Sequence, residues 1–196
     1  MKSLLQQSLE REIQHDKLIA QLSKNTVKGR VGRQHIVKLA SLLEPFLVSI
    51  CDALEMAAKY SKDPHSGRAV TFAVGQIIQY CFDEEDLFPE SHYGILGLLD
   101  DAYLVHRFAA MLRHHYPHVK VDGTSYHPVD ELTFRLVSEL LPAGVCDALD
   151  RTCNNLIQVA SALFTIGGGA KSNKKREFPN LRIEEAVSVA KDMPQL

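Results

Sequence analysis

The sequence lacks tryptophan, and it lacks the cysteine spacing that is typical of a metal site or a disulfide framework. No two of its four cysteines form a Cys-x-x-Cys pair. The pattern of a secretory signal is also missing, because residues 1–22 are rich in glutamine and charged side chains. We therefore expect reduced thiols and a cytoplasmic location, with contact at the periphery of a membrane left open.

Long hydrophobic runs are absent as well. The longest stretch without a charged residue covers residues 152–170, and it contains six Thr, Asn, Gln or Ser side chains and three consecutive glycines. Such a stretch is too polar for a confident membrane span, so the sequence predicts no transmembrane segment. The net charge is only −2, which gives no overall excess of positive charge for binding a polyanion.

The alternating pattern of a β-strand is not found, and the apolar periodicity is helical throughout. We predict an all-α, single-domain bundle of about seven helices with a helix–acidic loop–helix unit at its centre. The central unit should pack against a helix that begins at Pro45 and against the helix that follows Pro142. The other predicted helices cover residues 2–23, a short segment before Pro45, 67–81, 94–115 and 128–141.

The domain organisation follows from composition. Residues 1–33 are interpreted as an N-terminal helical arm and basic connector, 34–170 as the core domain, and 171–196 as a basic linker and C-terminal helix. The apolar positions of the first helix drift around its surface, which suits an arm or a partner surface as well as a core. We expect a protein partner, or self-association, through this helix.

The densest cluster of charge lies between residues 83 and 101, where seven carboxylates fall within 19 residues. Two of them, Asp100 and Asp101, are adjacent in an otherwise apolar stretch. On a helical wheel Asp101 falls inside the apolar arc, whereas Asp100 falls at its rim beside Arg107. Burying a carboxylate is costly unless it is hydrogen-bonded, paired or bound to a cation, so this segment is either a structural device or a site.

Two interpretations of these carboxylates stay open. In the first, Asp101 and its neighbour accept backbone N–H groups of the preceding loop and hold it in place. In the second, carboxylate oxygens bind Mg²⁺, Mn²⁺ or Ca²⁺, with His92 or His106 nearby. The candidate acidic cluster and metal ligands are Asp86, Glu90, Asp100 and Asp101.

The segment Asp86-Leu87-Phe88-Pro89-Glu90, followed by Gly97-Leu98-Leu99-Asp100-Asp101, resembles the signature of the bacterial YkvA-like domain of unknown function. That signature is Asp-Leu-Ile-Pro-Asp, a short spacer and Gly-x-x-Asp-Asp. The resemblance covers about residues 68–112, and it departs from the pattern at Phe88 and Glu90. It implies a small helical unit and no established activity.

A basic segment is the second candidate site. Six Lys and Arg residues and no acidic residue lie between Lys17 and Lys38. With its two glycines this segment could hold phosphates, nucleic acid or an anionic membrane surface, or it could be a solvated connector. It is no P-loop, because no Gly-Lys-Ser/Thr ends it. The candidate anion-binding residues are Lys28, Arg30 and Arg33.

No Ser/His/Asp or Cys/His set can be singled out, because a helical protein scatters these residues along the chain. We therefore expect a non-catalytic interaction or regulatory module, and an enzyme is the less favoured class. The alternative is a divalent-metal-binding protein or metal-dependent hydrolase that uses the acidic cluster. No cofactor other than a divalent cation is expected.

Overall fold

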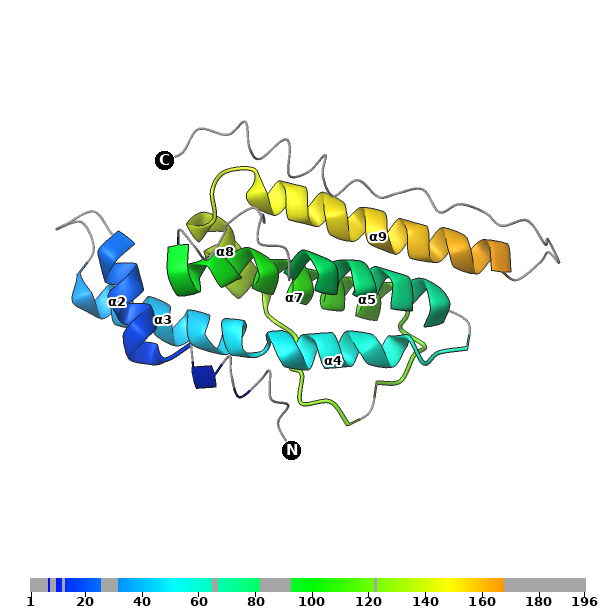
Figure 1. Ribbon diagram of the computed structural model, residues 1–196, viewed down its shortest axis with the longest axis horizontal. Helices are drawn as coiled ribbons and strands as arrows, with labels where there is room; N and C mark the ends of the chain where they lie inside the picture. Colours follow the sequence, from blue (N-terminus) through cyan, green and yellow to red (C-terminus); the bar gives the residue numbers. More distant parts are fainter. Residues whose placement is uncertain are drawn as a thin grey trace.

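The computed structural model describes residues 7, 10, 11, 13–25, 32–64, 67–81, 93–121 and 123–167. Within these residues the chain forms helices and no strand (Figure 1), so the predicted all-α fold is confirmed. The elements are α2 (His15–Asn25), α3 (Arg33–Val48), α4 (Ile50–Tyr60), α5 (Gly67–Cys81), the 3-10 helix η1 (Gly94–Gly97), α7 (Leu98–His115), α8 (Glu131–Leu140) and α9 (Val145–Gly167). None of these helices is long and apolar enough to cross a bilayer.

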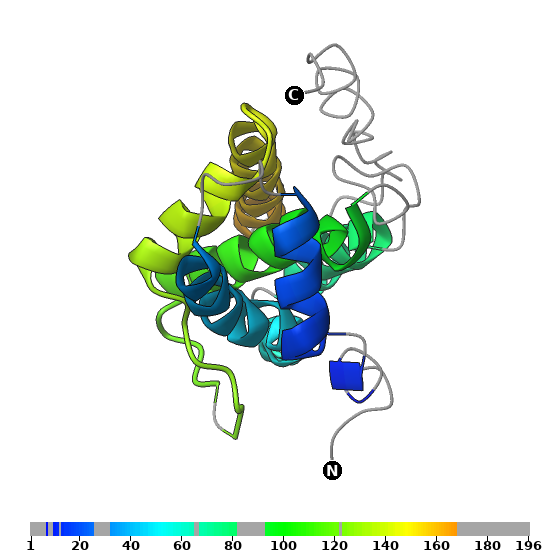
Figure 2. The same ribbon diagram turned by 90° about the vertical axis from the view of Figure 1, so that its left-hand side faces the viewer.

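Helix α7 lies in the middle of the bundle. It packs against α9, α4, α3, α5 and α8, and Figure 2 shows α9 above it, α5 at its side and α4 below it. The predicted packing of the central unit is confirmed, because α5 and α7 both contact α4 and α9. Every residue of α7 from Leu99 to His106 is buried.

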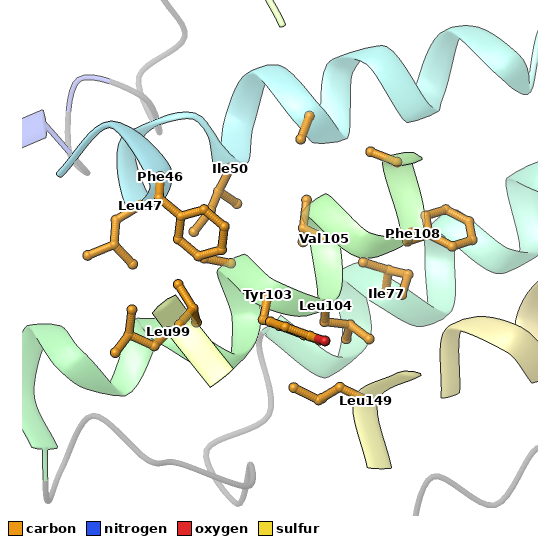
Figure 3. Packing of buried hydrophobic residues seen from close by; sticks show 14 of the residues in the cluster. Phe46, Leu47, Ile50, Ile77, Leu99, Tyr103, Leu104, Val105, Phe108 and Leu149 are labelled. Atoms are coloured by element: carbon orange, nitrogen blue, oxygen red, sulfur yellow. The ribbon is translucent and has the colours of Figure 1, made fainter. Parts of the chain in front are cut away.

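One hydrophobic core joins all of these elements. Figure 3 shows Phe46 of α3 and Ile50 of α4 above the side chains of α7, with Leu149 of α9 below them. The apolar face predicted for the last helix is buried in its described part, at Val145, Leu149, Cys153, Leu156 and Ile157. A core shared by every helix supports a single domain.

The helix predicted to begin at Pro45 instead begins at Arg33 and passes through Pro45. Proline in a helix removes one donor and leaves the carbonyl four residues earlier without its partner. Both Pro45 and Ser41 are exposed, so water can reach that carbonyl. The chain leaves the helical path later, at Ser49 between α3 and α4.

The N-terminal segment also differs from the prediction. Ile13, Leu18 and Leu22 are buried in the core, and α2 packs against α3 and η1. The amide of Gln21 donates a 2.9 Å hydrogen bond to the Tyr93 carbonyl. The described part of the predicted arm therefore contributes these apolar residues to the core.

The predicted continuous helix over residues 2–23 is interrupted at residues 13 and 14, before α2 begins. The basic linker and C-terminal helix predicted for residues 171–196 lie outside the described residues.

Gly67 is needed at the start of α5 for a close backbone approach. Its N–H donates to the Asp63 carbonyl at 2.8 Å, and a Cβ atom there would overlap the backbone oxygen of Ser61. We expect Gly67→Ala to lower the free energy of unfolding by about 1–3 kcal/mol, because the overlap forces the turn to move.

Gly75 of α5 is the matched control, because a Cβ atom there meets open space. Gly75→Ala should raise the free energy of unfolding by about 0.5–1 kcal/mol. Urea denaturation of both variants measures the difference. Equal stability of the two variants would show that the approach of Gly67 to Ser61 is not constraining.

Candidate functional site

Asp100 and Asp101 lie in the first turn of α7, directly after η1. They are 0% and 3% exposed. The predicted burial of Asp101 is confirmed, and the prediction that Asp100 lies at a rim is wrong. The helical wheel assumed one buried face, whereas α7 is enclosed on all sides at this level and has no rim there.

The end of α5 supplies hydrogen-bond donors to both carboxylates. Tyr80 donates its phenolic O–H to Oδ2 of Asp100 at 2.8 Å. The Cys81 thiol is hydrogen-bonded to Asp101, and its pKa is raised first by burial and then by the charge of Asp101. The thiol therefore keeps its proton and donates it to the carboxylate. These two contacts join the last turn of α5 to the first turn of α7.

Arg107, which we expected beside Asp100, contacts Asp150 of α9. Its Nε lies 3.1 Å from Oδ1 of Asp150, and its Nη2 lies 3.5 Å from Oδ2. Tyr103 donates to the same Oδ1 at 3.1 Å. The guanidinium also lies over the ring of Phe134 in α8, 5.5 Å from the centroid. This half-buried cluster holds α7, α8 and α9 together.

His106 is fully buried and both of its ring nitrogens have partners. Nε2 lies 2.8 Å from the Phe46 carbonyl oxygen, and Nδ1 lies 3.2 Å from the Tyr126 hydroxyl. A carbonyl oxygen only accepts, so Nε2 carries the proton and Nδ1 accepts from Tyr126. Burial lowers the pKa of His106 to about 4, although the bond to Phe46 raises it. His106 is thus neutral and engaged, and it does not serve as the metal ligand we considered.

Tyr126 is a partner that the sequence analysis did not identify. The signal available in the sequence was a histidine that directly follows Leu104 and Val105, because a polar ring next to apolar residues must find partners when it is buried. The sequence contains no indication of which residue supplies them.

The four cysteines are thiols outside any disulfide. Cys153 is buried and donates to the Leu104 carbonyl at 3.6 Å. The pKa of the Cys146 thiol is raised to about 11, mainly by burial, and burial also raises the pKa of Cys153. These thiols therefore stay protonated at neutral pH, which disfavours them as nucleophiles or metal ligands.

The remaining candidate residues are only partly described. Asp86, Glu90, Lys28 and Arg30 lie outside the described residues, and Arg33 is exposed at the first position of α3. Over the ranges that the structure describes, no three His, Cys, Asp or Glu side chains are placed to hold a metal ion. A cation at Asp100 and Asp101 would therefore need ligands from the acidic residues 83–90, which lie outside the described part.

Comparison with known proteins adds no relative: no family model, no curated protein and no solved structure matches this chain. The resemblance to the YkvA-like domain rests on the motif residues alone. Function is therefore argued below from the contacts of the described side chains.

Tyr80→Phe tests how much the buried carboxylate depends on its donor. We expect the free energy of unfolding to fall by roughly 1–3 kcal/mol, because a buried carboxylate loses a hydrogen bond. Tyr103→Phe is the matched control, because it removes a bond to Asp150, whose side chain is 32% exposed. Its cost should stay below about 1 kcal/mol. Urea denaturation that gives equal costs would contradict the structural importance of the Tyr80 bond.

Proposed function

We propose that this protein is a non-catalytic helical interaction or regulatory module. The observation that carries the proposal is that the buried polar side chains of α7 are hydrogen-bonded to other residues of the same chain. Asp100 accepts from Tyr80, and Asp101 accepts from the Cys81 thiol. His106 is hydrogen-bonded to the Phe46 carbonyl and to the Tyr126 hydroxyl. Groups that could perform acid–base chemistry are thereby committed to holding helices together.

A module of this kind acts through its surface. Leu132, at the start of α8, is 76% exposed and is the most exposed large aliphatic side chain among the described residues. Covering such a side chain is favourable for any partner, by roughly 1.5–3 kcal/mol when burial is complete. Leu132 is therefore the residue at which a test of the proposal is best directed.

The full chain, used as bait in native lysate and analysed by light scattering after purification, should give a defined partner or a stable self-assembly. Leu132→Asp should reduce the captured amount at least about tenfold if α8 forms the contact. Glu139→Ala, an exposed position on the same helix, is the matched control and should leave capture unchanged. A monomer that enriches no protein would refute the proposal.

A second candidate function is divalent-cation binding at the acidic cluster. The specific observation in its favour is the pair of adjacent carboxylates at the start of α7, both almost fully buried. A cation would offset the cost of burying two negative charges side by side. The further ligands would be Asp86 and Glu90 in the preceding acidic loop, with Mg²⁺, Mn²⁺ or Ca²⁺ bound by oxygen atoms.

Asp101→Asn separates a structural anchor from a metal ligand. For an anchor, we expect the free energy of unfolding to fall by roughly 1–3 kcal/mol with or without metal. A metal site would instead stabilise the wild-type protein, by about 2.7 kcal/mol at a metal concentration 100 times the Kd, and the variant would lose this gain. Calorimetric titration and thermal unfolding at millimolar Mg²⁺, Mn²⁺ and Ca²⁺ decide, and we expect the anchor.

A further inference from the structure

The segment between α7 and α8 lies along the outside of α4 (Figures 1 and 2), and we call residues 116–130 the strap, of which Asp122 is outside the described part. Two polar contacts join it to α4. Lys59 donates to the Gly123 carbonyl at 2.8 Å, and Ser125 donates to Oδ1 of Asp52 at 2.8 Å.

The strap buries few side chains. Its two buried residues are Tyr116 and Tyr126, and its valines are only partly covered. The Tyr60 and Tyr116 rings are 6.5 Å apart, and the Tyr126 ring stacks on His106 with centroids 5.7 Å apart. A segment with so little buried area opens at a lower free-energy cost than the helices beneath it.

The hydrogen bond from Tyr126 to His106 has its present direction only with a neutral imidazole. Tyr126 donates its proton to Nδ1 over 3.2 Å. Protonated His106 would place an N–H donor against this hydroxyl, so the hydroxyl could only accept, and its own proton would lose the imidazole as a partner.

The groups facing the ring offer little compensation for a positive charge. The α3–α4 junction presents the Phe46 carbonyl and the Ser49 hydroxyl, which lies 3.3 Å from Nε2. The strap presents Tyr126, on which Arg113 of α7 acts as a nearby positive charge. On α4, Asp52 is bound to Ser125.

We propose that the strap is an acid-released latch, in which protonation of the buried His106 reverses its hydrogen bond with Tyr126 and the cost of the buried charge frees residues 116–130 while the helical core stays folded. The latch is a regulatory device independent of the proposed function. Its opening would uncover the α3–α4 junction and the face of α7 that carries His106. The closed strap therefore controls access to this part of the core.

The direction of the pH effect follows from linkage. The pKa of His106 is about 4 under the closed strap, and an exposed histidine has a pKa of about 6.5. The open form therefore binds the proton more tightly. The closed strap has its full stability above about pH 6.5 and loses it as the pH falls towards 4. Between pH 7.5 and pH 5 the opening equilibrium should rise roughly 20- to 30-fold.

Hydrogen exchange of the full chain, measured at pH 7.5 and pH 5 and corrected for the intrinsic rates, tests the latch. We expect the protection factors of strap amides to fall roughly 20- to 30-fold at pH 5. Amides of α7 and α9 should keep larger protection factors than strap amides at both pH values, and their exchange should depend more steeply on urea, because they exchange through global unfolding. No loss in the strap, or strap exchange with the same urea dependence as the core, would overturn the proposal.

Three variants make the test specific. His106→Gln keeps a donor and an acceptor without titrating, so the strap should no longer respond to pH; an undiminished response would also overturn the latch. Ser125→Ala removes only the contact with Asp52 and should keep the response.

If His106→Gln does not fold, Tyr126→Phe provides the test. This variant keeps the aromatic ring and loses the hydrogen bond to His106, so its strap should already exchange faster at pH 7.5. Unchanged exchange in Tyr126→Phe would refute the role of the bond.

Discussion

Helix α7 carries polar side chains into the middle of the core, and the arrangement of its neighbours depends on how these side chains are satisfied. From Leu99 to His106 the helix has no solvated face, yet the stretch includes two aspartates and a histidine. A buried polar group without partners costs about 1–3 kcal/mol, and a buried charge costs more. The elements around α7 must therefore bring hydrogen-bonding groups to fixed positions.

These partners come from separate elements of the chain. The end of α5 brings Tyr80 and Cys81 to the aspartates. The junction of α3 and α4 brings the Phe46 carbonyl to His106, next to the point where the helical path is interrupted at Ser49. Packing alone tolerates small shifts between helices, whereas these contacts require defined distances. Because the buried ionisable groups of α7 are already engaged in hydrogen bonds to neighbouring elements, we look for function on the surface instead.

Helical periodicity was sufficient to predict most of the fold. The bounds of α5 were predicted because Asp63-Pro64 ends the preceding helix and a run of acidic residues follows Cys81 in the sequence. The buried face of α9 was predicted because one side of it faces solvent. The wheel failed for Asp100 because it cannot represent a helix enclosed on all sides. The pairs Arg107–Asp150 and His106–Tyr126 join residues 43 and 20 positions apart, and local sequence patterns contain no information on such contacts.

A double-mutant cycle on Tyr80 and Asp100 tests most directly whether buried polar contacts of α7 fix its neighbours. The free energies of unfolding would be measured for Tyr80→Phe, Asp100→Asn and the double variant by urea denaturation. The account predicts a coupling energy of at least about 1 kcal/mol, because the two side chains share one buried hydrogen bond. Additive effects, with a coupling energy near zero, would contradict it.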